Sequence, residues 1–220
     1  MMNAPDSTVA GQKFDSSWEP FIPYADLSSC PPDLKPALDA LIGRLGFVAN
    51  SHKFYLHNAG VLRAILAMID NISSNPDGTL DRVLRRKLAV VCSAANGCVY
   101  CTTHQCQFLT RPRAGLGEAE GWGLSMKEVH ELIDGRETSS SDFERLCLEF
   151  ARKASHDPRG VPDQLRARLA KVLSPAQVVE LAAVVAYWKF LNTLHDCLTV
   201  PPEEQNLKFT GVLDANASAA

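Results

Sequence analysis

The sequence lacks an excess of positive charge, and this absence already limits its partners. Lysine and arginine together number 22, aspartate and glutamate number 25, and the formal net charge is −3. Proteins that bind nucleic acids through their phosphates normally carry a basic excess. We therefore predict no nucleic-acid partner, and the charge gives no support for binding at a membrane surface.

The sequence also lacks a long, uninterrupted apolar run. The longest candidate, residues 178–191, contains Glu180 and Lys189, whereas a membrane-spanning helix needs about 20 predominantly apolar residues. The opening stretch MMNAPDSTVAGQKFD has no apolar segment after a basic start, so it does not fit a secretory signal. These absences predict a cytoplasmic protein without a membrane partner.

Strand signals are missing as well. No window shows sustained alternation of apolar and polar residues, whereas apolar residues recur at helical spacing, as at Leu34, Leu38, Leu41 and Leu45. Of the 220 residues, 46% are hydrophobic and 21% are charged, which is typical of a globular protein. We predict an all-α fold with a single compact body of about eight helices.

The predicted domain organisation has three parts. Prolines between apolar anchors indicate an extended N-terminal arm over residues 1–30. Residues 31–205 are predicted to form the helical domain, and residues 206–220 a C-terminal tail. The Asn96-Gly97 pair separates two of the helices. Helices are expected at about residues 33–45, 53–72, 81–95, 98–109, 126–133, 143–151, 163–173 and 176–198.

The seven cysteines do not fit a disulfide framework, because their number is odd and no export signal precedes them. Four of them fall between Cys92 and Cys106. In a reducing compartment such a cluster indicates a metal site, a redox pair or packed thiols. Cys30, Cys147 and Cys197 are expected to be packed as small hydrophobic residues, and packing is favoured for Cys92 too.

The motif Cys98-Val99-Tyr100-Cys101 begins a predicted helix, where free amides and the helix dipole stabilise a thiolate. The spacing brings the two sulfur atoms close enough to bridge, and His104 follows one helical turn after Cys101. The motif also begins many zinc sites, with His104 or Cys106 as a third ligand, and inert packed thiols are a further alternative. Because no second CxxC is present, we predict a redox pair with no metal ion and no cofactor.

Several segments in a fixed order make the chain resemble the carboxymuconolactone decarboxylase/alkylhydroperoxidase D family, most closely its peroxidase-related branch. The resemblance covers about residues 41–204, and its motifs are Gly46-Phe47-Val48-Ala49-Asn50, His57-Asn58, Val61-Leu62-Arg63, Leu80-Asp81-Arg82, Asn96-Gly97 with the CxxC, and a late segment from Val179 to Asn192. It implies an all-α fold, homo-oligomers and an antioxidant peroxidase that uses a redox-active disulfide. Cys101 would attack a hydroperoxide or disulfide, Cys98 would resolve the intermediate, and a lipoyl or thioredoxin-like dithiol partner would return the electrons.

Two positions depart from the family pattern. The glutamate that the family carries twelve residues before the first cysteine is Arg86 here, and the histidine four residues after the second cysteine is Gln105, with His104 one position earlier. An arginine stays protonated and cannot act as a base. Because Arg86 stands between two other basic residues, it is expected on a solvated helix face. His104 is the predicted catalytic histidine.

The remaining histidines and the late aromatic residues are expected to be structural. His195 beside Asp196 is interpreted as a partly buried, satisfied histidine, and His57 as capped or packed. Surface positions are expected for His52, His130 and His156, and core or interface positions for Tyr187, Trp188 and Phe190.

Three function classes follow from these patterns. A thiol-dependent oxidoreductase acting on hydroperoxides or disulfides is favoured. A different small-molecule enzyme on the same fold, such as a lactone decarboxylase, is the second hypothesis, because Arg86 weakens the peroxidase relay. A non-catalytic oligomeric protein is the third, because function resides in the site rather than in the fold.

Overall fold

The computed structural model describes residues 19–112, 121–136 and 140–212, and the regular elements in these ranges are all helical. This confirms the all-α prediction. The α-helices are α1 (Lys35–Leu45), α2 (Asn50–Tyr55), α3 (Ala59–Met68), α4 (Arg82–Ala95), α5 (Val99–Thr110), α6 (Met126–Asp134), α7 (Asp142–His156), α8 (Asp163–Val172) and α9 (Pro175–Cys197). Shorter elements are η1 (Leu27–Ser29), the π turn η2 (Ile69–Ser73) and the 3₁₀ segment η3 (Glu204–Val212).

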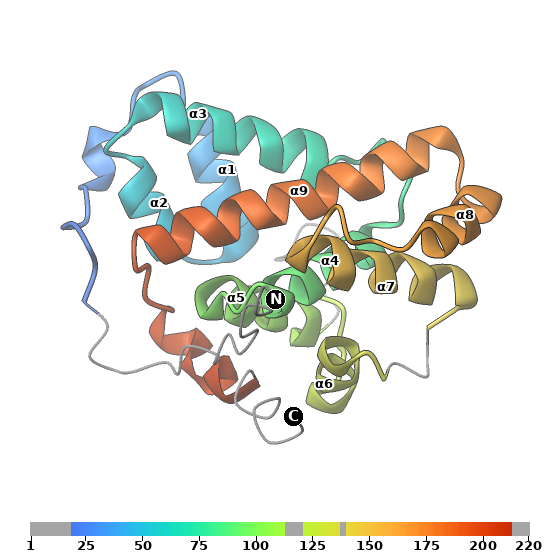
Figure 1. Ribbon diagram of the computed structural model, residues 1–220. Coiled ribbons are helices and arrows are strands. Elements are labelled where there is room, and N and C mark those ends of the chain that lie inside the picture. The colour runs from blue at the N-terminus through green and yellow to red at the C-terminus, as the bar shows by residue number, and fades with distance from the viewer. Residues whose placement is uncertain (1–18, 113–120, 137–139, 213–220) are drawn as a thin grey trace, which may run out of the picture.

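Helices α4 and α9 organise the core. Figure 1 shows α9 running along the length of the molecule, and α9 packs against α4, α5, α7 and η2. Helix α4 packs in turn against α5, α6 and α7. Side chains such as Leu88 on α4 and Val184 on α9 are fully buried between these helices. The CxxC motif therefore lies inside the helical body rather than on a surface loop.

Side-chain caps set several helix starts at the predicted residues. Asp81 accepts hydrogen bonds from the backbone amides of Val83 and Leu84 at the start of α4, and Ser125 with Glu128 forms a capping box at α6. Helix α4 ends at Asn96, and Gly97 turns the chain at a φ of 72° before α5. This turn orients the start of α5 into the core.

The single helix predicted over residues 53–72 is wrong. Helix α2 ends at Tyr55, and Asn58 adopts an extended conformation in which its side chain accepts from the amides of Gly60 and Val61. An asparagine that satisfies the first amides of a new helix offers the backbone an alternative to continuing the old one. Helix α3 then continues directly into the π turn η2, whose last residue is Ser73.

The C-terminal segment packs on the body beyond the predicted boundary at residue 205. Element η3 continues to Val212 and contacts α5, with Asn206 and Phe209 buried. Most of the predicted N-terminal arm (residues 1–18) and the end of the predicted tail (residues 213–220) lie outside the described residues. Among the helices that the structure describes, none is both long and apolar enough to cross a membrane.

Candidate active site

The two cysteines of the motif lie together at the buried start of α5. Cys98 is the N-cap residue and Cys101 lies in the first turn, with 0% and 1% of their surfaces exposed. Both are free thiols. Their sulfur atoms and the Nδ1 atom of His195 all lie within 4.8 Å of one another. The structure therefore brings together the two sulfur atoms that the sequence paired, and adds a histidine from α9.

His195 is the histidine that contacts the thiol. Its Nδ1 atom lies 2.9 Å from Sγ of Cys101, and its Nε2 atom is hydrogen-bonded to the hydroxyl of Tyr55. Burial, together with the nearby His104 and His52, lowers the pKa of His195 to about 3, against an opposing effect of Glu203. The imidazole is therefore neutral near pH 7, and with a neutral thiol it accepts at Nδ1 and donates from Nε2 to Tyr55.

Burial also keeps both thiols protonated, but not equally. Burial raises the pKa of Cys101, while its hydrogen bond with Cys98 lowers it. For Cys98, burial and the same hydrogen bond both raise the pKa, and the negative charge of Asp196 adds to the effect. Because the shared hydrogen bond favours a thiolate on Cys101 at the expense of Cys98, Cys101 is the more acidic of the two.

His104 faces a different partner, although it lies one turn from Cys101. Its Nε2 atom is paired with Oε2 of Glu203, and both side chains are buried. The second oxygen of Glu203 accepts from the Tyr100 hydroxyl at 3.1 Å and from the Asn50 amide at 2.6 Å, and Asn206 donates to Oε2 at 3.0 Å. Burial alone would raise the pKa of Glu203, but His104 and the backbone amide of Asn50 hold it at about 2.

A cavity of about 90 Å³ opens beside the cysteine pair. Cys101, His104 and His195 lie in its wall, whereas Cys98 does not. Its aromatic wall residues are Tyr55, Tyr100, Phe108, Tyr187 and Trp188. A small molecule in this cavity would meet Cys101 before Cys98. Tyr187 and Trp188 are buried as expected of core residues, yet they also line this cavity, and Phe190 is exposed.

The prediction that Arg86 lies on a solvated helix face is wrong. The side chain is 8% exposed and lies in the cavity wall, with its guanidinium 4.8 Å from the Phe108 ring centre and 3.4 Å from the Ser73 hydroxyl. The reason is that α4 is surrounded by other helices, so little of its surface remains for solvent. Burial lowers the pKa of Arg86 to about 10, and it is still a cation near pH 7. It cannot replace the family glutamate as a base.

Two other predictions, that His52 is exposed and that Cys197 is packed, are also wrong. His52 is 5% exposed and lines the cavity, because α2 presents it to the core rather than to solvent. Cys197, expected to be packed, is exposed at the last turn of α9, whereas Cys30, Cys92, Cys106 and Cys147 are buried. His57 is exposed, with Nε2 2.8 Å from the Pro23 carbonyl oxygen.

The turn after α9 carries Glu203 into the site. Thr199 ends the helix at a φ of 46°, and the amide of Val200 donates to the carbonyl of His195 at 3.0 Å. This left-handed end of a helix is usually occupied by glycine. Sequence reasoning missed Glu203, whose only local signal is an acidic pair following Pro201-Pro202.

The fold and the site define a helical protein with a buried dithiol, a neutral imidazole and a small aromatic-walled cavity. Residues 59–134 match the model of the Carboxymuconolactone decarboxylase family, and this segment runs from α3 to α6 and includes the CxxC motif. The resemblance to that family is thus confirmed over this segment. No curated protein sequence matches the chain.

Solved structures show the same fold over nearly their whole length. The debrominase Bmp8 has a TM-score of 0.71 at 21% identity and covers 86% of this chain and 96% of its own. An uncharacterized peroxidase-related protein from Ralstonia eutropha JMP134, described as an alkylhydroperoxidase core, has a TM-score of 0.67 at 19% identity, with 85% and 94% covered. Another from Silicibacter sp. TM1040 gives 0.66 at 19% identity, with 92% and 97% covered. The chain therefore has the alkylhydroperoxidase D-like helical fold.

Proposed function

We propose that the protein is a thiol-dependent oxidoreductase that reduces small hydroperoxides or disulfides with Cys101 and Cys98. The observation that carries the proposal is the contact between Cys101 and His195 in the cavity wall, with Cys98 directly behind. A thiol that is protonated at rest needs an adjacent base to become a nucleophile. His195 is placed to be that base because its neutral Nδ1 lies 2.9 Å from the sulfur.

The reaction consumes two thiols and one hydroperoxide. Cys101 transfers its proton to His195 and attacks the terminal peroxide oxygen; the O–O bond breaks, and the alkoxide takes up a proton and leaves as an alcohol. Cys101 is then a sulfenic acid. The Cys98 thiol attacks this sulfur, a Cys98–Cys101 disulfide forms and water leaves. The burial of Cys98 behind Cys101 supports the roles that the resemblance implies.

A second thiol system must return the two electrons. Attack by a dithiol, such as a lipoyl group or a thioredoxin-like protein, opens the disulfide and forms a new one on the partner. We place the protein in the cytoplasm, where such systems keep thiols reduced, and we expect it to be a homo-oligomer. In this scheme His104 and Glu203 hold Tyr100 and the C-terminal segment in place.

The test is hydroperoxide turnover with an excess of small dithiol as reductant. Cys101→Ser should abolish turnover, and Cys98→Ser should give one turnover and leave a sulfenic acid that dimedone traps. Cys106→Ser is the matched control, because Cys106 is equally buried on the same helix but lies outside the cavity wall. Undiminished turnover in a folded Cys101→Ser protein would refute the proposal.

Reductive debromination is a second candidate, favoured by the aromatic wall of the cavity. A cysteine-to-alanine variant of the debrominase Bmp8, solved with 2,3,4-tribromopyrrole, has a TM-score of 0.72 at 21% identity and covers 89% of this chain and 96% of its own. The balanced reaction turns two thiols and an aryl bromide into a disulfide, the arene and hydrogen bromide. Bromide release from a bromopyrrole, dependent on Cys101 and exceeding turnover of hydroperoxides, would select this function over the first.

A further inference from the structure

Three atoms that prefer the same kind of metal ion converge at the start of α5. They are the two sulfur atoms of Cys98 and Cys101 and the Nδ1 atom of His195, all within 4.8 Å of one another and all buried. We propose that the reduced protein binds one Zn²⁺ ion through these three atoms. This site goes beyond the proposed function and does not rest on it, because it requires the two thiols and the imidazole but no turnover.

The spacing of the three atoms fits a tetrahedral ion after a small adjustment. Typical Zn–S and Zn–N bond lengths place two tetrahedral ligands roughly 3.5–3.8 Å apart. The mutual limit of 4.8 Å includes this range, and the distance between Cys101 and His195, 2.9 Å, has to open by roughly half an ångström. A side-chain rotation of that size needs no movement of α5 or α9.

The charge of this set stays balanced when an ion binds. A thiolate alone would be an uncompensated charge at this buried position. Binding of Zn²⁺ displaces one proton from each thiol, so the complex of two thiolates and the ion is neutral. The imidazole contributes its unprotonated nitrogen, the form that ligates zinc.

The surroundings orient each of these atoms. Tyr55 contacts Nε2 of His195, and a hydrogen bond on the second ring nitrogen is what holds a metal-bound imidazole in position. Asp196, next to His195 on α9, places a negative charge near Cys98. Because Cys101 and His195 lie in the cavity wall, the fourth coordination position faces the cavity, where a water molecule has room.

Zinc and the disulfide exclude each other. A hydroperoxide that oxidises the zinc-bound thiolates takes up two protons, forms the Cys98–Cys101 disulfide, an alcohol and water, and releases the ion. The zinc-bound form would therefore be the reduced form, and the site would empty on oxidation.

The first experiment titrates the full-length reduced protein with Zn²⁺ against a chromophoric chelator of micromolar affinity. We expect one ion per chain, release of protons on binding, and a thiolate-to-metal charge-transfer band when Co²⁺ replaces Zn²⁺. Mg²⁺, which prefers oxygen ligands, should not compete. Failure of the reduced protein to compete with the chelator would overturn the proposal.

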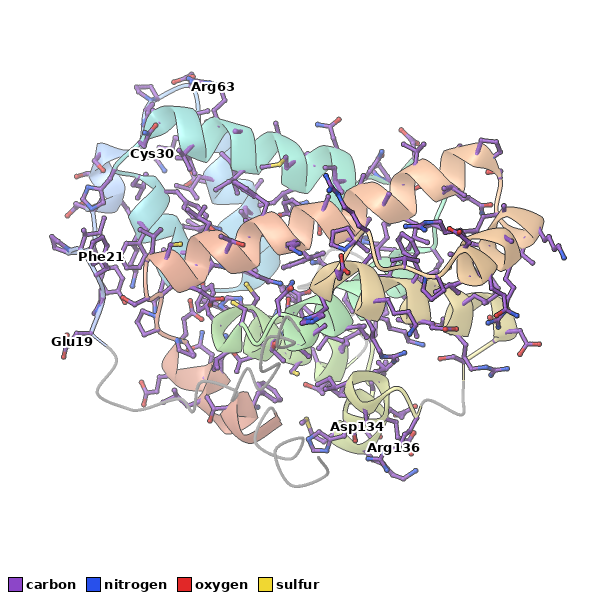
Figure 2. All side chains as sticks on the ribbon, viewed as in Figure 1. Glu19, Phe21, Cys30, Arg63, Asp134 and Arg136 are labelled. Atoms are coloured by element: carbon purple, nitrogen blue, oxygen red, sulfur yellow. The ribbon has the colours of Figure 1, made fainter. Side chains whose placement is uncertain are left out.

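Single variants then assign the site. Cys98→Ser, Cys101→Ser and His195→Gln should each weaken binding by more than about 100-fold, since losing even an outer partner of a metal ligand costs 10–100-fold. Cys106→Ser and Cys30→Ser serve as controls and should keep the wild-type affinity. Figure 2 shows Cys30 at the edge of the molecule, away from α5. Wild-type affinity in Cys98→Ser or His195→Gln would overturn the assignment.

A further measurement uses the wild-type chain, so its result does not depend on whether a variant folds. Protein whose Cys98–Cys101 disulfide has been formed beforehand should not bind Zn²⁺, and reduction should restore binding. Equal binding by the oxidised and reduced forms contradicts the site. Zinc binding without hydroperoxide turnover in the metal-free protein would defeat the proposed function alone, and turnover without zinc binding would defeat this inference alone.

Discussion

Two buried histidines in the wall of the same cavity show how partners decide what one residue type can do. His104 on α5 is paired with the Glu203 carboxylate, in a cluster that also includes Tyr100 and Asn50. His195 on α9 is instead hydrogen-bonded to two neutral groups, the Cys101 thiol and the Tyr55 phenol. Burial among its neighbours keeps the His195 imidazole neutral near pH 7.

The two environments suit different roles, a structural role for His104 and a chemical role for His195. A histidine held by a buried carboxylate is committed to that pair, because releasing it would leave the carboxylate buried without its partner. A neutral histidine beside a thiol is able to take a proton and return it. In the function that we propose, the base is therefore His195, whereas the sequence predicted His104.

The largest expected effect is on turnover. His195→Gln should lower kcat/KM for hydroperoxides by about 10²–10⁴-fold, the usual contribution of a general base, because the amide cannot accept the thiol proton. His104→Gln should lower it by less than about tenfold, since it removes no contact to the sulfur. Steady-state kinetics on both proteins, with folding checked by thermal melting, measures the ratio. Equal losses in the two variants would remove the distinction between the histidines.

The next effect is on stability and its pH dependence. The pKa of Glu203 is about 2 in the folded chain against an ordinary value of 4.5, and a shift of this size corresponds to about 3 kcal/mol. Because the folded pKa is the lower one, this stabilisation is fully present above pH 4.5 and is lost as the pH falls towards 2. Glu203→Gln should therefore be less stable than wild type at pH 7, and the gap should close over that acid range.

The free energy of unfolding of both proteins is measured by urea denaturation at a series of pH values. The matched control is Arg63→Gln, which breaks the exposed ion pair with Asp33 at 2.6 Å; Arg63 is labelled at the edge of the molecule in Figure 2. Exposed pairs contribute little, so this variant should follow the wild type at every pH. A Glu203→Gln protein as stable as wild type at pH 7 would show that the buried pair does not hold the C-terminal segment.

The smallest expected effect concerns the hydrogen bond at Nε2 of His195. Tyr55→Phe removes the hydroxyl that contacts Nε2, and the loss of one neutral hydrogen bond is worth about 1 kcal/mol, or about fivefold in rate. We expect kcat to fall by that factor while KM stays unchanged, because Tyr55 orients the base and only borders the cavity. A change confined to KM would instead indicate that Tyr55 acts on substrate.

The sequence predicts local features of the fold and site well, because they depend on neighbours along the chain. The break at Asn96-Gly97, the helix starts near residues 81 and 126, and the placement of Cys98 and Cys101 at a helix start are of this kind. Each depends on a few adjacent residues and on backbone geometry.

The contacts that define the site are not local, and this is why they were not predicted. His195 lies 94 residues from Cys101, and Glu203 lies 99 residues from His104. Nothing in helical periodicity states which face of α9 meets α5. Arg86 was misassigned for the same reason, since a run of three basic residues gives no information on how many other helices surround α4.

The turn at Thr199 limits how many residues can lie between His195 and Glu203. His195 and Glu203 lie on either side of that turn, one beside Cys101 and the other beside His104. A single-residue insertion or deletion between them would move one partner by about 3 Å relative to the other. Among homologous chains that keep both partners, we expect this interval to have a constant length, even where its residues differ.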